Sequence, residues 1–412
     1  MRFLTAVIVL LFSALAHADF LEVRRSVTLK NEPHTDSAIR EQLTSGERLE
    51  LLDNGTQENG YYHARTLRGS DGWVYRTFVR RHPGQLPGQP GAGAGVDLGN
   101  LGPWAVHFLD VGTGDSAVVD MGDSEIVIDG GDSIAVLDAY QRRTSVIDGP
   151  IELAIVTHGD TDHWNGLRRL LGFDGVTSVS APLRALEYWD PGYDRDCDPP
   201  NSGGHDNYLN FVKAMQSLAG PGFRRPLEDH FRPAVVSGAP EPFTLPAFPG
   251  ATFTLLHSDA NPTGPDCAYK INNASIVFML EMEGVRFLFT GDANGKERDE
   301  PSPGTPGHVE RKLLDLERAH PGTLKADVLK VPHHGSQTAS TQAFIDAVDP
   351  AFAIISASTK HRLPKDVVVA RYTNGERVIV RTDENLPNNT DHIICTRVAG
   401  DLQCNFANVL AE

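Results

Sequence analysis

The sequence predicts an α/β domain preceded by a small all-β barrel, and three observations support this prediction. A Pro/Gly-rich segment divides the chain: eight of the thirteen residues from 83 to 95 are proline or glycine, a composition typical of linkers. Short strands separated by glycine turns precede this segment, and alternating strands and helices follow it. The predicted boundaries are a barrel over 19–82, a linker over 83–103 and an α/β domain over 104–412.

The first 18 residues have the pattern of a secretory signal peptide. Arg2 supplies the positive charge, residues 3–15 are apolar, and Ala16-His17-Ala18 has the small-x-small form of a cleavage site. A membrane anchor is the alternative, but the apolar run is too short to span a bilayer. We expect cleavage after Ala18 and a secreted or periplasmic protein.

Four cysteines fit this expectation, because an even number in an exported chain favours disulfides. The segment 393–406 alternates around a two-residue turn at Ala399-Gly400. In that register Cys395 lies opposite Cys404, which leaves Cys197 to pair with Cys267. A thiolate metal site is the alternative, but the C-x-x-C spacing typical of such sites is missing.

The formal net charge of −17 counts against a broad basic surface for nucleic acid. It leaves room for a local basic groove, or for a metal ion that contacts phosphate directly. Solubility is the ordinary explanation of such a charge.

The barrel is predicted from short strands at 27–29, 38–43, 48–52, 61–66 and 72–75. Their order resembles the bacterial Src-homology-3-like (SH3-like) domain over residues 20–81. The matching pieces are the Ser45-Gly46-Glu47 turn, Tyr61-Tyr62 and the closing Gly72-Trp73-Val74. The resemblance implies a module that binds cell wall or peptide, and a packing cap without a ligand is the alternative.

The large domain is predicted to consist of alternating strands and helices. Residues 184–250, where proline, glycine and aspartate are frequent, are predicted to form a long insertion beside the candidate site described below. The predicted strands are 105–110, 116–121, 125–129, 151–157, 251–256, 275–281, 285–290, 326–331, 351–356 and 378–381. The predicted helices are 134–143, 164–171, 308–317 and 341–347.

Four ligand-type side chains follow the apolar strand 151–157: His158, Asp160, Asp162 and His163. Carboxylates held close together repel one another, and a divalent metal ion removes that cost. Packing does not explain a buried strand that runs into such a cluster. The alternative is an Asp-rich surface turn or an ordinary helix N-cap.

Two further strands end in ligand-type residues. Strand 285–290 leads into Gly291-Asp292, and strand 326–331 leads into Pro332-His333-His334-Gly335-Ser336. Open α/β sheets place their sites at the carboxyl ends of strands, so the three clusters are expected to meet.

The order of these clusters resembles the metal motifs of the metallo-β-lactamase superfamily. Stretches at 107–116, 128–131, 329–336 and 381–383 are similar to the hydrolase domain of ComEC-type competence proteins. The resemblance covers about 104–398 and implies a four-layer αβ/βα sandwich with its site at the sheet edge. The channel-forming membrane part of those proteins is absent, so a role in DNA uptake does not carry over.

The resemblance also implies two divalent metal ions and their ligands. His158 and Asp160 would hold one ion, Asp162, His163 and His334 the other, and Asp292 would bridge them. Asp160 stands where a histidine is more usual. Asn272-Asn273 stands where the family often has a third histidine, and His257 is a second candidate for that role. Zinc suits the imidazoles, and the extra carboxylate leaves manganese open.

Such a centre would activate water for hydrolysis. Asp160 or Asp162 would accept the proton, and His333 and His361 are candidates for a general acid or a phosphate contact. Further candidates for phosphate contact are Lys330, Lys360 and Arg362. We expect Asp110, Asp115 and Asp129 to orient ligands or hold turns.

Three functions remain open from the sequence. The first is an exported phosphodiesterase or nuclease, with nucleic acid among its potential substrates. The second is a hydrolase of a wall-linked ester, amide or phosphodiester in the cell envelope. The third is a binding protein with a degenerate metal site.

Overall fold

The computed structural model describes residues 20–44, 47–66, 69–82, 102–144, 146–172, 183–199, 202–300, 305–358, 361–373, 377–383, 391–398 and 400–408. The predicted signal peptide over 1–18 and residues 83–101 of the predicted linker lie outside these ranges. No helix in the described part of the chain is both long and apolar enough to cross a membrane.

The N-terminal region forms an eight-stranded sheet in the order β3-β2-β7-β6-β4-β1-β8, with β5 paired to β6. Its strands are β1 (Phe20–Val23), β2 (Val27–Lys30), β3 (Ile39–Leu43), β4 (Arg48–Leu51), β5 (Gln57–Glu58), β6 (Tyr61–Thr66), β7 (Asp71–Tyr75) and β8 (Val79–His82). Leu21, Leu49 and Val74 belong to its buried core. The predicted all-β architecture is confirmed, and its SH3-like character stays a prediction.

The large domain contains two further sheets. The first has the order β14-β13-β12-β11-β10-β9-β21-β22, and the second has the order β15-β16-β17-β18-β19-β20. The first is built from β9 (Ala105–Phe108), β10 (Ala117–Asp120), β11 (Glu125–Ile128), β12 (Ile151–Ile155), β13 (Ala185–Trp189), β14 (Phe223–Arg224), β21 (Asp391–Val398) and β22 (Asp401–Asn408). The second is built from β15 (Ala251–His257), β16 (Val277–Met282), β17 (Val285–Phe289), β18 (Val328–Lys330), β19 (Phe352–Ile355) and β20 (Val378–Arg381).

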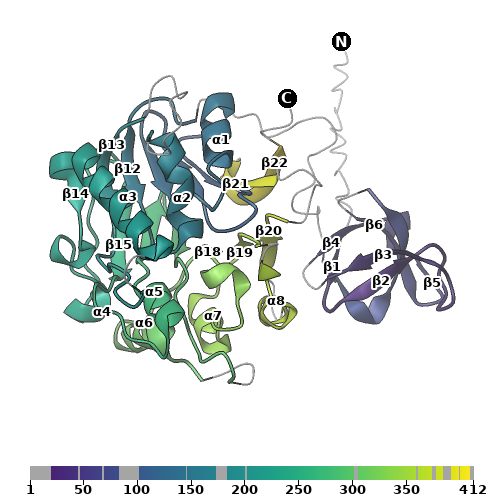
Figure 1. Cartoon of the computed structure of the whole chain (residues 1–412). Coiled ribbons are helices and arrows are strands. Elements are labelled where there is room, and N and C mark those ends of the chain that lie inside the picture. Colours follow the sequence, from purple (N-terminus) through teal and green to yellow (C-terminus); the bar gives the residue numbers. More distant parts are fainter. Residues whose placement is uncertain are drawn as a thin grey trace, which may run out of the picture.

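Helices cover the outer face of each sheet (Figure 1). The helices α1 (Val136–Thr144), α2 (Thr161–Leu170) and α3 (Gly203–Ala219) pack on the first sheet. The helices α6 (His308–Ala319), α7 (Gln342–Val348) and α8 (Asp366–Tyr372) pack on the second. Phe108 from one sheet and Phe289 from the other stack with ring centroids 6.0 Å apart, so the two sheets share a core. The predicted four-layer αβ/βα sandwich is therefore confirmed.

The central strands are apolar along their whole length because both of their faces are covered. Every residue of β9 and β11 is buried, and four of the five residues of β12 are buried. Continuous apolar runs of this kind are expected where a sheet lies between two layers. Such burial leaves the strand ends as the places where polar side chains can gather.

The predicted insertion at 184–250 contains regular structure that we did not predict. It supplies β13 to the first sheet and the 17-residue helix α3, along with the short helix α4 (Ala234–Ser237). Tyr208, Phe211 and Met215 are buried on the inner face of α3 at helical spacing, and Ser202 caps its N-terminus. The surrounding proline, glycine and aspartate residues masked this periodicity in the sequence.

Both predicted disulfides are present. Cys395 lies opposite Cys404 in the β21–β22 hairpin, in the predicted register, and the two are bonded. Cys197 is bonded to Cys267, the first residue of α5 (Cys267–Asn273). The thiolate metal site considered from the sequence is therefore excluded for these four cysteines.

Candidate metal centre

The predicted ligands lie in loops at one edge of the two sheets. β11 and β12 are parallel neighbours in the first sheet, and β17 and β18 are parallel neighbours in the second. Their carboxyl ends therefore open on the same side of each sheet. His158 follows β12, Asp292 follows β17 and His334 follows β18, so three strand ends supply the site.

Five of the six predicted ligands come together: His158, Asp162, His163, Asp292 and His334. Asp292 is central. Its Oδ1 lies 3.4 Å from His163 Nε2, and its Oδ2 lies 3.4 Å from His334 Nε2 and 4.0 Å from His158 Nε2. Asp162 Oδ2 lies 3.7 Å from His334 Nε2. We call Asp162, His163 and His334 the His334 half of the centre, and His158 with Asp160 the His158 half.

The converging atoms fit a metal ion. The Nε2 atoms of His158, His163 and His334 and Oδ1 of Asp292 are buried without a hydrogen-bond partner in the described part of the chain. Buried polar atoms are normally paired, because leaving one unpaired costs roughly 1–3 kcal/mol. Four such atoms facing one another are the donor set of a divalent metal site.

The charges at the centre are strongly coupled. Burial opposes the ionised form of Asp292, but the neighbouring His334 and His163 outweigh it and hold the pKa of Asp292 well below its usual range. Burial would lower the pKa of His334, but Asp292 and Asp115 outweigh that effect and raise it to about 10. The pKa of His163 is likewise raised by Asp292 and Asp129 against the effect of burial.

Two buried carboxylates stand behind the His334 half. Asp129 Oδ2 lies 2.8 Å from Nδ1 of His163, and Asp115 Oδ1 lies 3.0 Å from Nδ1 of His334. A partner on Nδ1 fixes the ring and turns Nε2 toward the centre. The structure thus places Asp115 and Asp129 in the ligand-orienting position expected from the sequence. Asp110 holds a turn, accepting a hydrogen bond from the amide of Gly112.

Lys330 has a different role from the one predicted. Its Nζ lies 2.7 Å from Asp115 Oδ2, and both side chains are buried. It therefore balances the charge of Asp115 and is not positioned to contact a substrate phosphate. Lys360 lies outside the described residues. Arg362 is exposed and is not among the described residues that line the cleft.

Asp160, the sixth predicted ligand, lies beside the five that come together, with its Oδ2 3.8 Å from His158 Nε2. It is the N-cap residue of α2, yet its side chain makes no capping hydrogen bond. Oδ1 instead accepts a hydrogen bond from Arg195 at 3.0 Å. Burial opposes ionisation of Asp160, but His158 and Arg195 outweigh it and lower the pKa. The N-cap alternative considered from the sequence had Thr161 or Asp162 as the capping residue, whereas the N-cap residue is Asp160 and α2 begins at Thr161.

The remaining predicted residues are divided between the cleft and the core. His333 lies 3.7 Å from Asp292 Oδ2 through Nε2, and His361 is exposed at the rim of the cleft. Asn272 lies beside His333, and its buried Oδ1 has no hydrogen-bond partner in the described chain. His257 faces the carbonyl of Ser275 and joins none of the ligand groups among the described residues. Asn272 is therefore the better candidate for the place of the missing histidine.

The centre opens into a cleft of about 490 Å³. Its lining residues are Asp160, Asp162, Ala268, Tyr269, Asn272, Asp292, Asn294, Arg298, His333, His334, Ser336, Gln337, Thr338, His361, Leu363 and Lys365. The acids in this lining are all predicted ligands, whereas the residues outside the ligand group include Arg298 and Lys365. A larger cavity of about 800 Å³ lies on the N-terminal all-β region and has no ligand group around it in the described chain.

The αβ/βα sandwich brings histidines and aspartates from both sheets together at one edge. The family model described as "Metallo-beta-lactamase superfamily" matches residues 109–257. The chain is therefore similar to this superfamily over that stretch, which is less than half of its length. The match includes the His158–His163 motif and both supporting carboxylates.

Comparison with known proteins adds one curated relative and several solved structures. ComE operon protein 3 of Bacillus subtilis (strain 168) is 33% identical over 127 residues, which are 30% of this chain and 14% of that protein. The chain thus matches about a seventh of that relative's length. The metallo-β-lactamase fold protein YhfI from Bacillus subtilis is 11% identical, with a TM-score of 0.38 over 68% of this chain and 98% of that one. Igni18, a metallo hydrolase from Ignicoccus hospitalis, is 12% identical, with a TM-score of 0.40 over 70% and 98%.

Proposed function

We propose that this protein is an exported metal-dependent phosphodiesterase that uses two divalent metal ions, zinc or manganese. The observation that carries the proposal is a reversal of charge around the cleft. The whole chain has a net charge of −17, yet the cleft residues outside the ligand group add cations and no carboxylate. Arg298 is exposed and Lys365 is half-buried at this rim. A cationic rim beside a metal centre suits an anionic ester such as a phosphodiester.

We assign metal binding and proton transfer to different side chains of the centre. His158, Asp160, Asp162, His163, Asp292 and His334 would hold the two ions. Metal ions at this place supply Lewis acidity, which favours hydroxide over water near neutral pH and stabilises charge on a substrate oxygen. Asp162, which is partly exposed to the cleft, would accept a proton.

His333 is the candidate for donating a proton to the leaving group. Thr338 Oγ1 lies 3.1 Å from its Nδ1, and its Nε2 lies 3.7 Å from Asp292 Oδ2 and 3.4 Å from Nδ2 of Asn272. Arg298 and Lys365 would bind the phosphate oxygens, and His361 lies at the same rim.

Turnover of bis(p-nitrophenyl) phosphate and plasmid DNA, measured with added Zn²⁺ or Mn²⁺, tests the proposal. We expect hydrolysis of the diester, and loss of that hydrolysis in Asp292→Ala. Hydrolysis of p-nitrophenyl acetate or a β-lactam but of neither phosphodiester, by protein with metal bound, would contradict it. Less than one equivalent of bound metal would favour the binding-protein alternative.

Substitution of the two cationic residues at the rim of the cleft tests the charge argument directly. Arg298→Ala and Lys365→Ala should raise KM for the diester while kcat changes little. The matched control is Lys312→Ala, because Lys312 is exposed, pairs with Asp259 and is not among the lining residues of the cleft. An unchanged KM in both rim variants would contradict the proposal that Arg298 and Lys365 bind the anionic substrate.

A cell-envelope substrate is the second candidate, and the barrel cavity favours it. Tyr61, Tyr75 and Phe78 line this cavity of about 800 Å³, and aromatic surfaces of this kind bind peptides and sugars. Sedimentation with purified cell wall measures the binding. We expect Tyr75→Ala to weaken it and Trp73→Ala to leave it unchanged, because Trp73 stacks on His63 and is not among the residues lining the cavity. Equal loss in both variants, or no binding by the wild type, would contradict a wall-binding role.

A further inference from the structure

Arg195 reaches the metal-ligand motif from the loop between β13 and α3. Its Nη1 donates to the carbonyl oxygen of Gly159 at 2.6 Å and to Asp160 Oδ1 at 3.0 Å. Its Nε donates to Asp198 Oδ2 at 2.7 Å. The side chain is 10% exposed, so the guanidinium is held between a carboxylate of the motif and a carboxylate of its own loop.

The backbone of Arg195 is strained. Its φ of +59° lies in the left-handed region, which costs a non-glycine residue on the order of 1–3 kcal/mol. Asp129, His333 and His334 share this conformation, with φ of +58°, +52° and +51°, and all three lie at the centre. Strain of this kind persists where surrounding contacts over-determine the conformation, and it is concentrated at functional sites.

The glycine inside the ligand motif makes room for Arg195. A Cβ atom at Gly159 would lie 3.2 Å from Cδ of Arg195 and 3.0 Å from Cε1 of Tyr208. Contacts this short force a neighbour to move. A side chain at position 159 would therefore require Arg195 or Tyr208 to shift by a few tenths of an ångström.

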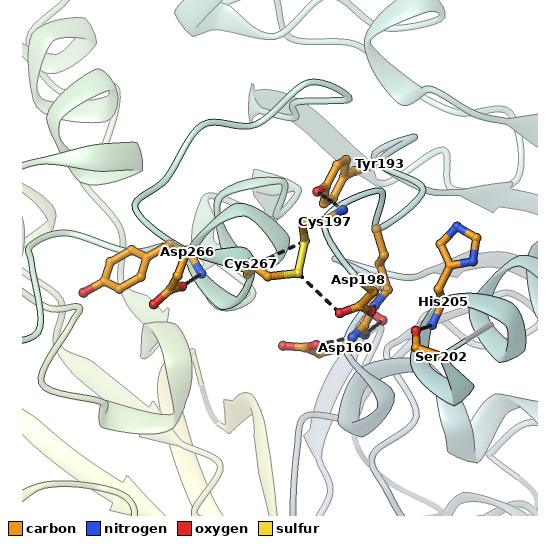
Figure 2. Close-up of a disulfide and its surroundings, with 11 residues drawn as sticks. Asp160, Tyr193, Cys197, Asp198, Ser202, His205, Asp266 and Cys267 are labelled. Atoms are coloured by element: carbon orange, nitrogen blue, oxygen red, sulfur yellow. Dashed lines mark hydrogen bonds and ion pairs between the residues drawn. A yellow bond between two sulfur atoms is a disulfide. The ribbon is translucent and has the colours of Figure 1, made fainter. Parts of the chain in front are cut away.

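The loop that carries Arg195 is fixed at both ends, and Figure 2 shows the disulfide at its C-terminal end. At its start, the fully buried Asp190 accepts hydrogen bonds from the amide of Gly192 and from Nε of Arg225, both at 2.8 Å. At its end, Cys197 is bonded to Cys267, and Sγ of Cys267 lies 3.3 Å from Asp198 Oδ1. The disulfide thus ties the loop to α5, which also carries Asn272 into the cleft.

We propose that Arg195 is a positioning residue for Asp160, and that the Cys197–Cys267 disulfide holds Arg195 in its place. Arg195 engages Oδ1, so Oδ2 stays on the side of His158 as the one oxygen available to a metal ion. The inference rests on the proposed metal centre. We therefore expect the His158 half of that centre to be complete only after the disulfide has formed. Its full metal affinity would then require an oxidising compartment.

Metal titration of Arg195→Gln and Arg195→Lys tests the role of the guanidinium. Calorimetry with Zn²⁺ separates the two equivalents, and the visible absorption of the Co²⁺-loaded protein reports on the ligands of each ion. We expect Arg195→Gln to weaken the second equivalent by about 10- to 100-fold, the usual effect of removing a group that orients a ligand, and to change its Co²⁺ spectrum. Arg195→Lys should restore part of the affinity, because a lysine can still donate to Asp160.

The control is Arg224→Gln, because Arg224 lies in β14 and its ion pair is with Glu187. The proposal is wrong if both Arg195 variants bind two equivalents as the wild type does. Failure of the wild type to bind even one equivalent would instead contradict the metal centre itself.

The disulfide is tested by comparing two double variants. Cys197→Ser with Cys267→Ser should weaken the second equivalent in the same direction as Arg195→Gln. Cys395→Ser with Cys404→Ser removes the bond within the β21–β22 hairpin and should leave metal binding unchanged. Equal effects of the two double variants would overturn the role given to Cys197–Cys267. If the first double variant does not fold, mild reduction of the folded Cys395→Ser/Cys404→Ser variant, with the reductant removed before the titration, breaks Cys197–Cys267 alone.

Discussion

Both halves of the proposed centre take ligands from the motif His158–His163, yet they differ in the side chains that support those ligands. In the His334 half, Asp129 faces Nδ1 of His163 at 2.8 Å and Asp115 faces Nδ1 of His334 at 3.0 Å. In the His158 half, Nδ1 of His158 lies 3.2 Å from the hydroxyl of Thr157. A carboxylate makes an imidazole a better donor to a metal than a hydroxyl does. We therefore expect the His334 half to bind its ion more tightly.

The difference shows that a ligand motif does not determine its own affinity. The supporting groups come from elsewhere in the chain: Asp115 and Asp129 precede the motif, and Arg195 follows it. Their contributions can be removed separately, and the expected effects decrease in the following order.

The largest effect is expected for Asp292→Ala, because Asp292 contacts both halves. Losing it should weaken both metal equivalents by more than about a hundredfold, beyond the effect of losing an orienting group, and should abolish turnover. Metal content after dialysis and diester hydrolysis are the measurements. Retention of both equivalents would show that Asp292 does not bridge.

Next is Asp129→Ala, which removes the partner of His163. We expect the tighter equivalent to weaken by about 10- to 100-fold in Zn²⁺ calorimetry. The control is Asp110→Asn, since Asp110 holds the Gly112 turn and faces no predicted ligand at ion-pair distance among the described residues. A loss confined to the weaker equivalent would reverse the comparison between the halves.

A smaller effect is expected for His158→Ala. This variant removes a ligand of the weaker half alone, so one equivalent should remain bound with nearly wild-type affinity. Mass spectrometry of the native protein counts the ions directly. If both equivalents disappear together, the halves are a single cooperative unit and the comparison fails.

The smallest effect is a pH dependence of the metal-free protein. Its cause is that Asp292 and Asp115 outweigh burial and raise the pKa of His334 to about 10. The folded-state pKa lies above the ordinary value of 6.5, so the stabilising contribution is complete below pH 6.5 and is lost as the pH rises toward 10. Thermal unfolding should therefore show the metal-free protein becoming less stable over this interval, while the zinc-loaded protein changes less, since metal replaces the proton.

The Asp115→Asn variant checks the origin of that pH dependence. It removes one of the two carboxylates that raise the pKa of His334, so the decline in stability should become shallower. An unchanged slope would assign the effect to another group.

The sequence predicted the parts of the molecule that depend on local pattern. The candidate ligand clusters could be located because apolar strands lead into them, as β12 leads into the His158 cluster and β17 leads into Gly291-Asp292, whereas the ligand roles came from the family resemblance. The Cys395–Cys404 pair followed from the alternation around a two-residue turn. In both cases the signal lies within a few neighbouring residues.

Features that depend on distant contacts were not predicted. Nothing near Arg195 marks it as a partner of Asp160, because that contact joins loops 35 residues apart. Lys330 was assigned to substrate because its buried partner Asp115 lies far away in the sequence. Helix α3 was missed although Tyr208, Phe211 and Met215 have helical spacing, since its glycine-rich start and the proline-rich flanks suggested a loop.

The position of the centre has a consequence for the mechanical integrity of the domain. His158, Asp162 and His163 follow strands of the first sheet, whereas Asp292 and His334 follow strands of the second. An ion held between them would act as a cross-link that closes loops of more than a hundred residues, and closing long loops removes entropy from the unfolded chain. Removing the metal should therefore weaken the packing between the two sheets. Limited proteolysis of the metal-free protein should then cut first in the segment that connects the two sheets.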